Sequence, residues 1–358
     1  MRIAAFMKYG DLAASTRQRL EQYAPFLNAH GIEIDYFPLL DNAHLRNIAN
    51  GSRTGIGSIV QSYARRLGQL LRARKFDLLW VHYELFPYLP GFLERLAFLP
   101  RRPVIYDYDD AIFHMYDQAP NPLVRALLGE KLKPLLEGAA ACLCGNEYLL
   151  RYADRYSDRL TILPTVVDTD QYTPRLAAPG TEPPVIGWIG SPSTWAYVRP
   201  LLGTLRALAA DGRARIRVVG AGRAADADLF PGLELVDWSE ESEIHEVRKM
   251  DIGIMPLPDE PWARGKCGYK LIQYMACGLP VVASPVGVNE QIVDAEETGL
   301  LAGSGEEWRS ALEKLLDDPE LRARFGAAGR RKAVEEYSLA TQAPRLLEAI
   351  RQAVRTRS

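Results

Sequence analysis

The stretch from Arg264 to Ala283 combines glycines, lysines and a short apolar helix pattern. Gly265 and Gly268 let a ligand approach the backbone, and the first N–H groups of a helix have no partner within it. Lys266 and Lys270 add positive charge at the same place. Together with the helix dipole, these groups predict a phosphate-binding loop. The alternative is an ordinary strand-to-helix turn whose lysines are solvated.

A second loop carries donors of the same kind. Gly190, Ser191 and Thr194 place N–H and hydroxyl groups where a helix begins, directly after an apolar strand pattern. A simple helix N-cap by Ser193 or Thr194 is the alternative explanation. Two anion-binding loops in one half of the chain favour a diphosphate ligand there.

The first half of the chain carries acids instead. Asp107, Asp109 and Asp110 crowd together at the end of an apolar strand pattern. Crowded carboxylates raise one another's pKa, and they suit metal coordination, acid–base chemistry or hydrogen bonds to sugar hydroxyls. Helix capping is the structural alternative. We predict Asp109, Asp110 and Lys266 as catalytic residues. Polar residues near neighbouring strand ends are predicted on an acceptor side: Tyr9, Gly10, Arg17, Arg19, His82 and Asp107.

Short apolar runs alternate with helical patterns through both halves, which predicts an α/β fold with doubly wound parallel sheets. A proline-rich segment, 173–184, marks a linker between a domain over 1–172 and another over 185–336, and a helix closes the chain over 337–358. The expected strands are Arg2–Phe6, Ile32–Phe37, Asp77–His82, Pro103–Asp107, Ala140–Cys144, Leu160–Leu163, Val185–Ile189, Ile216–Val219, Leu233–Val236, Ile252–Met255 and Leu279–Ala283.

One glycine motif is typical of a different ligand, a nicotinamide dinucleotide. The stretch Ile216–Ala225 fits Gly-x-Gly-x-x-Ala after a strand, as in nicotinamide-binding folds. The segment from Arg223 to Gly232 is too short for a packed crossover helix, however. The spacing therefore disfavours a dinucleotide site.

A basic segment lies between Asn42 and Phe76, which contains no acidic residue. Within it, apolar residues recur at helical spacing from Ile56 to Leu71, and we expect this stripe to pack on the sheet with the arginines facing away. The alternative is a basic surface over residues 46–75 that rests on anionic lipid.

Composition excludes several classes of protein. A net charge of -2 over 358 residues gives no global reason to bind nucleic acid. No apolar run approaches the roughly 20 residues that span a bilayer, and Met1–Phe6 is typical of a strand rather than a signal peptide. The four cysteines form no disulfide or metal pattern, so we expect a reducing, cytoplasmic location. Hydrolase triads, zinc motifs and a Walker loop are absent from the sequence.

Several motifs resemble the family-four glycosyltransferases of the GT-B type. Gln273–Ser284, Gly287–Glu290 and Gly299–Leu301 are similar to that family's most specific pattern, and Asp251–Pro256 and Leu163–Asp168 match further runs. The resemblance implies two Rossmann-like domains across a cleft and a last helix that crosses back to the first domain. It also implies transfer of a sugar from a nucleotide diphosphate donor, usually with retention and without a metal or cofactor. The donor-binding candidates are Gly190, Ser191, Thr194, Lys266, Lys270, Gln273, Asn289 and Glu290.

The chain departs from this family at three positions. The family's paired glutamates fall on Gly265 and Gln273, and its histidine near the sugar falls on Asp109. A glutamine still suits a ribose hydroxyl, but a glycine offers no carboxylate to the sugar. A further departure is that the arginine and lysine with which the family holds the diphosphate, in the first loop of the second domain, are missing, and that loop carries Ser191 and Tyr197 instead. We expect Lys266 and Lys270 to neutralise the leaving diphosphate in their place.

We therefore predict a hexosyltransferase that acts on a glycan or lipid-linked acceptor in cell-surface polysaccharide or glycolipid synthesis. We expect it in the cytoplasm, at the inner face of the membrane. A non-catalytic nucleotide-sugar-binding relative, or a partner subunit of a glycosyltransferase, is the main alternative, motivated by Gly265. A sugar-nucleotide epimerase of the same shape is a third.

Overall fold

The structure is a computed structural model that describes residues 1–49, 55–175 and 183–355, and these form two compact units. Unit 1 comprises Met1–Thr165, Gly265–Cys267 and Gln342–Ser358. Unit 2 comprises Val166–Arg264 and Gly268–Thr341. The proposed linker over 173–184 lies largely outside the described residues, so its character stays a prediction, as do the domain limits.

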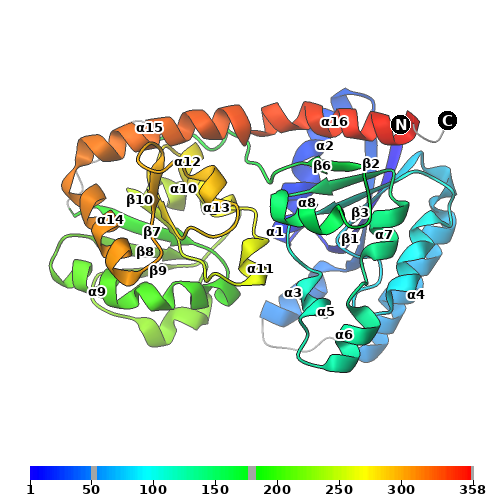
Figure 1. Cartoon of the computed structure of the whole chain (residues 1–358), viewed down its shortest axis with the longest axis horizontal. Coiled ribbons are helices and arrows are strands. Elements are labelled where there is room, and N and C mark those ends of the chain that lie inside the picture. Colours follow the sequence, from blue (N-terminus) through cyan, green and yellow to red (C-terminus); the bar gives the residue numbers. More distant parts are fainter. Residues whose placement is uncertain (50–54, 176–182, 356–358) are drawn as a thin grey trace. The chain divides into compact units, whose positions relative to one another are not determined.

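The described part of unit 1 is built on a six-stranded parallel sheet with the order β2-β1-β3-β4-β5-β6 (Figure 1). Its central strands are apolar and buried along their whole length, because helices cover both faces. This confirms the predicted fold class for the first half. The strands are β1 (Arg2–Tyr9), β2 (Glu33–Leu40), β3 (Leu78–His82), β4 (Val104–Tyr108), β5 (Ala141–Cys144) and β6 (Leu160–Ile162).

Helices and 3₁₀ helices (η) connect these strands. The sequence patterns predict continuous helices over Thr16–His30 and Pro122–Leu136, and both are interrupted. The first breaks at Leu20, before Pro25 in the first turn of α2, and the second at Gly129, where a side chain would overlap the backbone of Arg125. The connecting elements are α1 (Ala14–Arg19), η1 (Glu21–Tyr23), α2 (Ala24–Ala29), α3 (Asn42–Ala49), α4 (Ile56–Arg72), η2 (Ala73–Lys75), η3 (Gly91–Phe98), α5 (His114–Asp117), α6 (Pro122–Leu128), α7 (Lys133–Gly138) and α8 (Glu147–Ala153).

The described part of unit 2 holds a second six-stranded parallel sheet, with the order β12-β11-β10-β7-β8-β9 (Figure 1). Successive residues of a strand enter different apolar cores, as Trp188 and Ile189 of β7 do, so both faces are buried. The last strand was not expected as a strand. The bounds are β7 (Val185–Ile189), β8 (Arg215–Val219), β9 (Leu233–Val236), β10 (Ile252–Met255), β11 (Val281–Ala283) and β12 (Gly299–Leu301).

The connection between β8 and β9 is the 3₁₀ helix η6, not an α-helix, as the short spacing predicts. The connection after β7 contains both kinds of helix. A single helix over Trp195–Ala210 is predicted from the sequence, but Pro200 interrupts it. These elements are η4 (Pro192–Tyr197), η5 (Arg199–Leu201), α9 (Leu202–Ala210), η6 (Gly222–Asp228), α10 (Glu243–Arg248), α11 (Pro261–Arg264), α12 (Tyr269–Ala276), α13 (Asn289–Ile292), α14 (Gly305–Asp317) and α15 (Pro319–Glu336).

The last helix, α16 (Leu339–Arg355), begins within unit 2, but its residues from Gln342 onward belong to unit 1. Its apolar face is buried at Leu346, Leu347 and Ile350. No described helix is both long enough and apolar enough to cross a membrane.

Helix α4 contradicts most of the expectation that its apolar stripe packs inward, because Leu70 is fully buried but other members of the stripe are exposed. Ile56 and Val60 are 81% and 62% exposed, and Leu67 and Leu71 are 41% and 57% exposed. Arg66 instead lies on the buried face, where its guanidinium donates to the carbonyls of Met7 and Phe37. The sequence could not show this, because both faces of the helix contain apolar residues.

Candidate functional site

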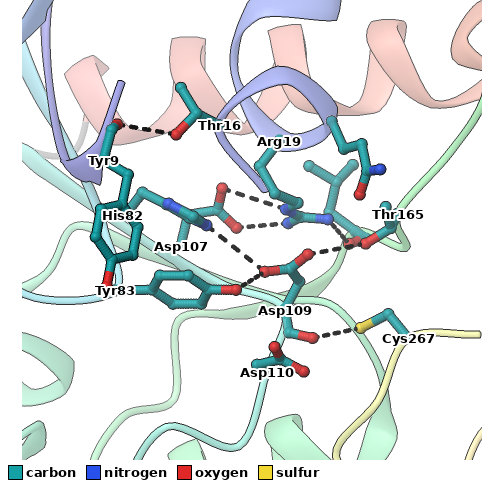
Figure 2. A network of polar contacts seen from close by, with 12 residues as sticks. Tyr9, Thr16, Arg19, His82, Tyr83, Asp107, Asp109, Asp110, Thr165 and Cys267 are labelled. Atoms are coloured by element: carbon teal, nitrogen blue, oxygen red, sulfur yellow. Dashed lines mark hydrogen bonds and ion pairs between the residues drawn. The ribbon is translucent and has the colours of Figure 1, made fainter. Parts of the chain in front are cut away.

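The acids predicted from the sequence meet at the carboxyl end of β4 in unit 1 (Figure 2). Asp107 is fully buried and forms a bidentate ion pair with Arg19 of α1, at 2.5 Å and 3.4 Å. The same guanidinium donates to the carbonyl of Leu163 at 2.7 Å, and the Trp80 indole donates to Asp107 at 3.3 Å. Since neither charged side chain reaches the surface, any part that they take in ligand binding is indirect.

Asp109 lies two residues further on and is 8% exposed. Its carboxylate accepts hydrogen bonds from the Tyr83 hydroxyl at 2.5 Å and from Thr165 Oγ1 at 3.3 Å. His82 Nε2 lies 3.6 Å away, just beyond hydrogen-bond distance. Burial opposes ionisation, but the His82 imidazole, the Arg19 charge and the Tyr83 hydroxyl outweigh it and lower the pKa of Asp109 to about 2. This carboxylate is therefore charged at neutral pH.

Tyr83 is a member of this cluster that sequence reasoning missed. Its backbone has φ +66°, in the left-handed region that non-glycine residues seldom occupy. Its N–H donates to the carbonyl of Asp107, so the turn directs its hydroxyl to Asp109. Burial and the charges of Asp109 and Asp110 raise the pKa of this hydroxyl well above its usual value, so it stays a donor. A tyrosine gives no sequence signal for such a turn, whereas a glycine would have.

The segment Gly265–Cys267 belongs to unit 1, although the sequence on either side of it belongs to unit 2. Asn146 fixes it by donating from Nδ2 to the carbonyls of Gly265 and Lys266, both at 3.0 Å. Gly265 packs so closely on Ala111 that a Cβ would overlap the alanine methyl and lie 3.0 Å from its nitrogen.

Two further contacts join this segment to the acids. The Cys267 thiol donates to the carbonyl of Asp109 at 2.9 Å, and burial raises the pKa of that thiol well above its usual value. Lys266 Nζ forms an ion pair with Asp110 Oδ1 at 2.9 Å, with both side chains about a quarter exposed, at 22% and 28%. The structure thus brings all three residues predicted as catalytic into one cluster of unit 1.

The other acceptor-side candidates form local contacts in unit 1. The Tyr9 carbonyl accepts from the Thr16 hydroxyl at 3.0 Å, and Arg17 donates to the carbonyl of Asp11 at 2.7 Å. A Cβ on Gly10 would lie 2.5 Å from Asn42 Oδ1, so the Asn42 side chain packs directly on this glycine. These contacts order the loop after β1 and leave its role in binding a prediction.

In unit 2 the two predicted phosphate loops meet. Lys270, in the first turn of α12, lies beside Gly190: a Cβ on that glycine would come 2.9 Å from Lys270 Cε. The Lys270 ammonium lies 5.8 Å from the centre of the Trp188 ring. Parallel sheets of this kind bind ligands at the carboxyl ends of strands where the strand order reverses, which here is between β7 and β10.

Ser191 and Thr194 cap η4 by a reciprocal capping box, and Ser191 is exposed. A helix cap does form here, as in the sequence alternative, but the N-cap residue is Ser191 rather than Ser193 or Thr194, and Thr194 is its reciprocal partner at the third helical position. Hydroxyls in a cap can still accept or donate one further hydrogen bond to an anion.

The remaining donor-side candidates differ in burial. Gln273 is 2% exposed and donates from Nε2 to Glu243 Oε1 at 2.6 Å and to the Tyr172 hydroxyl at 3.0 Å. Asn289 is fully buried; its Nδ2 donates to the carbonyl of Ser284, but its Oδ1 has no hydrogen-bond partner. Glu290 is exposed at the start of α13.

Comparison with known proteins relates part of the chain to a family. A model described as "Glycosyl transferases group 1" matches residues 183–318, which hold the sheet of unit 2 and the loops around Gly190 and Lys270. Over these residues the chain is similar to the family-four glycosyltransferases.

A curated relative, the D-inositol 3-phosphate glycosyltransferase of Thermobispora bispora, is 27% identical over 172 residues. That match covers 48% of this chain and 35% of the relative, so the chain spans about a third of that protein's length.

Solved structures with a similar fold match this chain over nearly its whole length. The sucrose-phosphate synthase of Thermosynechococcus elongatus has a TM-score of 0.74 at 19% identity, covering 99% of each chain. HepE of Anabaena, solved with UDP-glucose, has a TM-score of 0.73 at 15% identity, covering 98% of this chain and 99% of that one. At these identities the likeness shows the fold alone.

Among residues 1–49, 55–175 and 183–355, no group of three or more acids, histidines or cysteines is able to hold a metal ion. The cations and donors described above could hold a charged ligand. Lys270 and Gly190 suit a phosphate in unit 2, whereas Asp109 carries negative charge in unit 1.

Proposed function

We propose that the protein transfers a hexose from a nucleotide diphosphate sugar to a glycan or lipid-linked acceptor. The reaction breaks the bond between the sugar's anomeric carbon and a phosphate oxygen, and the acceptor oxygen takes its place. Its hydroxyl proton leaves to the phosphate or to a carboxylate. The match of residues 183–318 to a glycosyltransferase family model supports this proposal, together with a curated relative named as a glycosyltransferase.

The observation that carries the proposal is the convergence of Gly190 and Lys270 at the carboxyl end of the unit 2 sheet. A glycine lets an anion approach the backbone, and a lysine beside it neutralises phosphate charge as that charge develops on the leaving group. Ser191 adds an exposed hydroxyl at the same loop. We propose that these residues hold the donor diphosphate.

Asp109 and the Lys266–Asp110 pair are proposed to act on the sugar. An ionised carboxylate stabilises positive charge on the sugar ring during transfer, or accepts a hydrogen bond from a sugar hydroxyl. Retention of configuration and independence of metal are part of the proposal and rest on the family resemblance. So does a role in cell-surface polysaccharide or glycolipid synthesis.

Alanine variants of the two lysines test the proposal. We expect Lys270→Ala to weaken nucleotide diphosphate binding at least tenfold, because a charge-assisted contact to phosphate is worth about 1.5–3 kcal/mol. Lys266→Ala releases Asp110 and is expected to reduce turnover more than nucleotide affinity. Calorimetry and a nucleotide-release assay give both quantities. Unchanged affinity and turnover in both variants would sink the assigned roles.

A non-catalytic nucleotide-sugar-binding relative is the second candidate, and Gly265 favours it. No side chain fits at that position against Ala111, so no carboxylate is supplied there. This candidate predicts tight binding of a nucleotide sugar with neither transfer nor hydrolysis on any acceptor. Product formation from any donor and acceptor pair excludes it, and conversion of a nucleotide sugar without an acceptor would instead support an epimerase.

We further propose that unit 1 contacts anionic lipid through α4. The exposed residues Ile56, Val60, Leu67 and Leu71 fall within an arc of about 60° on one side of the helix. Arg65 and Arg72 of α4 are also exposed, about 100–120° around the helix axis from the stripe, and no acidic residue occurs between Asn42 and Phe76. Such a surface suits the interface of an anionic bilayer, where a lipid-linked acceptor would lie. Residues 50–54 of the proposed contact lie outside the described residues.

A further inference from the structure

The carboxyl ends of three neighbouring strands converge in unit 2. Gly190 follows β7, Gly220 follows β8, and Trp238 lies two residues after β9. Gly220 has φ +82°, and a Cβ there would overlap the Gly190 carbonyl oxygen and lie 3.1 Å from Trp238 Cβ. The tryptophan is thus separated from the loop proposed to hold the diphosphate by a single glycine.

Trp238 is the most exposed tryptophan among the described residues. Four others are only 0% to 2% exposed and Trp262 is half-buried; the four are Trp80, Trp188, Trp195 and Trp308. Trp238 is 37% exposed, although burying an aromatic side chain is favourable by a few kcal/mol. This tryptophan beside a glycine-rich strand end therefore presents aromatic surface next to the loop proposed to hold the diphosphate.

Hydrogen bonds hold the indole in place. Its Nε1 donates to Glu243 Oε2 at 2.6 Å, and the other oxygen of that carboxylate accepts from Gln273 Nε2, also at 2.6 Å. The Tyr172 hydroxyl donates to the same oxygen. Since the indole N–H is used within unit 2, the exposed part of the side chain offers aromatic surface rather than a hydrogen-bond donor.

We infer that Trp238 is the surface on which the nucleobase of the donor stacks, and that Glu243 is its positioning residue. A nucleobase is flat and aromatic, and it is joined through ribose to the diphosphate that the loop at Gly190 is proposed to hold. Stacking of a base on an aromatic side chain contributes about 1–3 kcal/mol and does not depend on the base. The inference rests on the proposed function, because it assigns a residue to the same donor.

Calorimetry on the full chain with UDP, GDP and inorganic pyrophosphate tests the inference. We expect Trp238→Ala to weaken both nucleotides by roughly 5- to 150-fold, the range that corresponds to the stacking energy, and to leave pyrophosphate affinity unchanged. Trp238→Phe keeps an aromatic ring and is expected to stay within about threefold of wild type. Leu229→Ala, which removes an exposed side chain elsewhere in unit 2, serves as the matched control.

Glu243→Ala separates positioning from contact. This variant keeps the indole ring but removes the carboxylate that accepts its hydrogen bond. We therefore expect a smaller loss of nucleotide affinity than in Trp238→Ala. We also expect the Trp238 side chain to become more mobile, as measured by its fluorescence. Nucleotide affinity that is unchanged in Trp238→Ala, or pyrophosphate affinity that falls as much as nucleotide affinity, overturns the inference alone. A wild-type protein that binds no nucleotide overturns both the inference and the proposed function.

Discussion

Asp109 carries a negative charge inside unit 1 because the groups around it compensate for the loss of water. The Tyr83 hydroxyl and Thr165 Oγ1 donate to it, and the His82 imidazole lies 3.6 Å away. Arg19 adds positive charge behind them while it pairs with Asp107. A buried carboxylate with these partners is held in one orientation, which is what a group that must face a developing positive charge requires.

The lowered pKa of Asp109 predicts how the stability of the protein depends on pH. A carboxylate whose pKa falls from 3.8 to about 2 on folding adds stability above pH 4, and this stability is lost as the pH falls from 4 to 2. We expect the wild type to lose roughly 1 kcal/mol more than Asp109→Asn between pH 5 and pH 3, by urea unfolding. The control is Asp158→Asn, because the Asp158 side chain is 96% exposed. Equal losses in wild type and Asp109→Asn would contradict the prediction.

At the scale of elements, Asn146 connects the start of α8 to the segment Gly265–Cys267. Its Oδ1 caps α8 by accepting from the Leu149 N–H at 3.0 Å, while its Nδ2 donates to the two carbonyls of the segment. One amide side chain thus serves two elements because its two ends differ in hydrogen-bonding character.

Substitution of Asn146 separates these two roles. Asn146→Asp keeps the accepting oxygen and therefore the cap of α8, but it loses the N–H groups that donate to the segment. Asn146→Ala loses the cap and the donors alike. We expect faster hydrogen exchange at Lys266 and Cys267 in both variants, and faster exchange at the first turn of α8 in the alanine variant alone. Loss of the cap costs about 1 kcal/mol. Unchanged exchange at the segment in Asn146→Asp would show that the two hydrogen bonds do not hold it.

The exposed stripe of α4 gives a second prediction at this scale. We expect the wild type to sediment with vesicles that contain phosphatidylglycerol, less so with phosphatidylcholine alone, and less at high salt, because the arginine contribution is screened. Replacing Ile56, Val60, Leu67 and Leu71 by serine should reduce that binding at least tenfold.

The matched control for α4 replaces two exposed apolar residues of unit 2, Leu229 and Val334, by serine. Analytical ultracentrifugation distinguishes a lipid surface from contact between two copies of the chain. Vesicle binding that survives the four α4 substitutions, or a dimer that they abolish, would contradict the lipid assignment.

At the scale of the whole molecule, ligand binding is expected to appear as thermal stabilisation. A nucleotide that binds only the folded state adds about 2.7 kcal/mol at a hundred times its dissociation constant. We expect a rise in Tm with the diphosphates of one of uridine, guanosine or thymidine, and a smaller rise in Lys270→Ala. We also expect turnover to persist in a chelator, since metal independence is part of the proposal. Loss of turnover in the chelator, restored by a divalent cation, would contradict that part.

The sequence alone determined the order of strands and helices and the class of fold. Apolar runs bounded by glycine and proline specify buried strands locally, so most strand limits agree with the structure within one or two residues, as for β7 and β10. Interrupted helices were less predictable: Gly129 is the C-cap of α6, and a glycine within a helical pattern does not by itself mark where the helix ends. The strand β12 is too short to carry a pattern of its own.

Only the tertiary structure decided which candidates come together. It grouped Lys266 with Asp110 in unit 1 and Lys270 with Gly190 in unit 2, although the sequence treats the two lysines as one motif. It also placed Arg66 inside and the stripe of α4 outside. Residue type and spacing report local preference, whereas burial and pairing depend on neighbours that are distant in sequence. For that reason the phosphate-friendly loop was visible in the sequence, and the partner of each lysine was not.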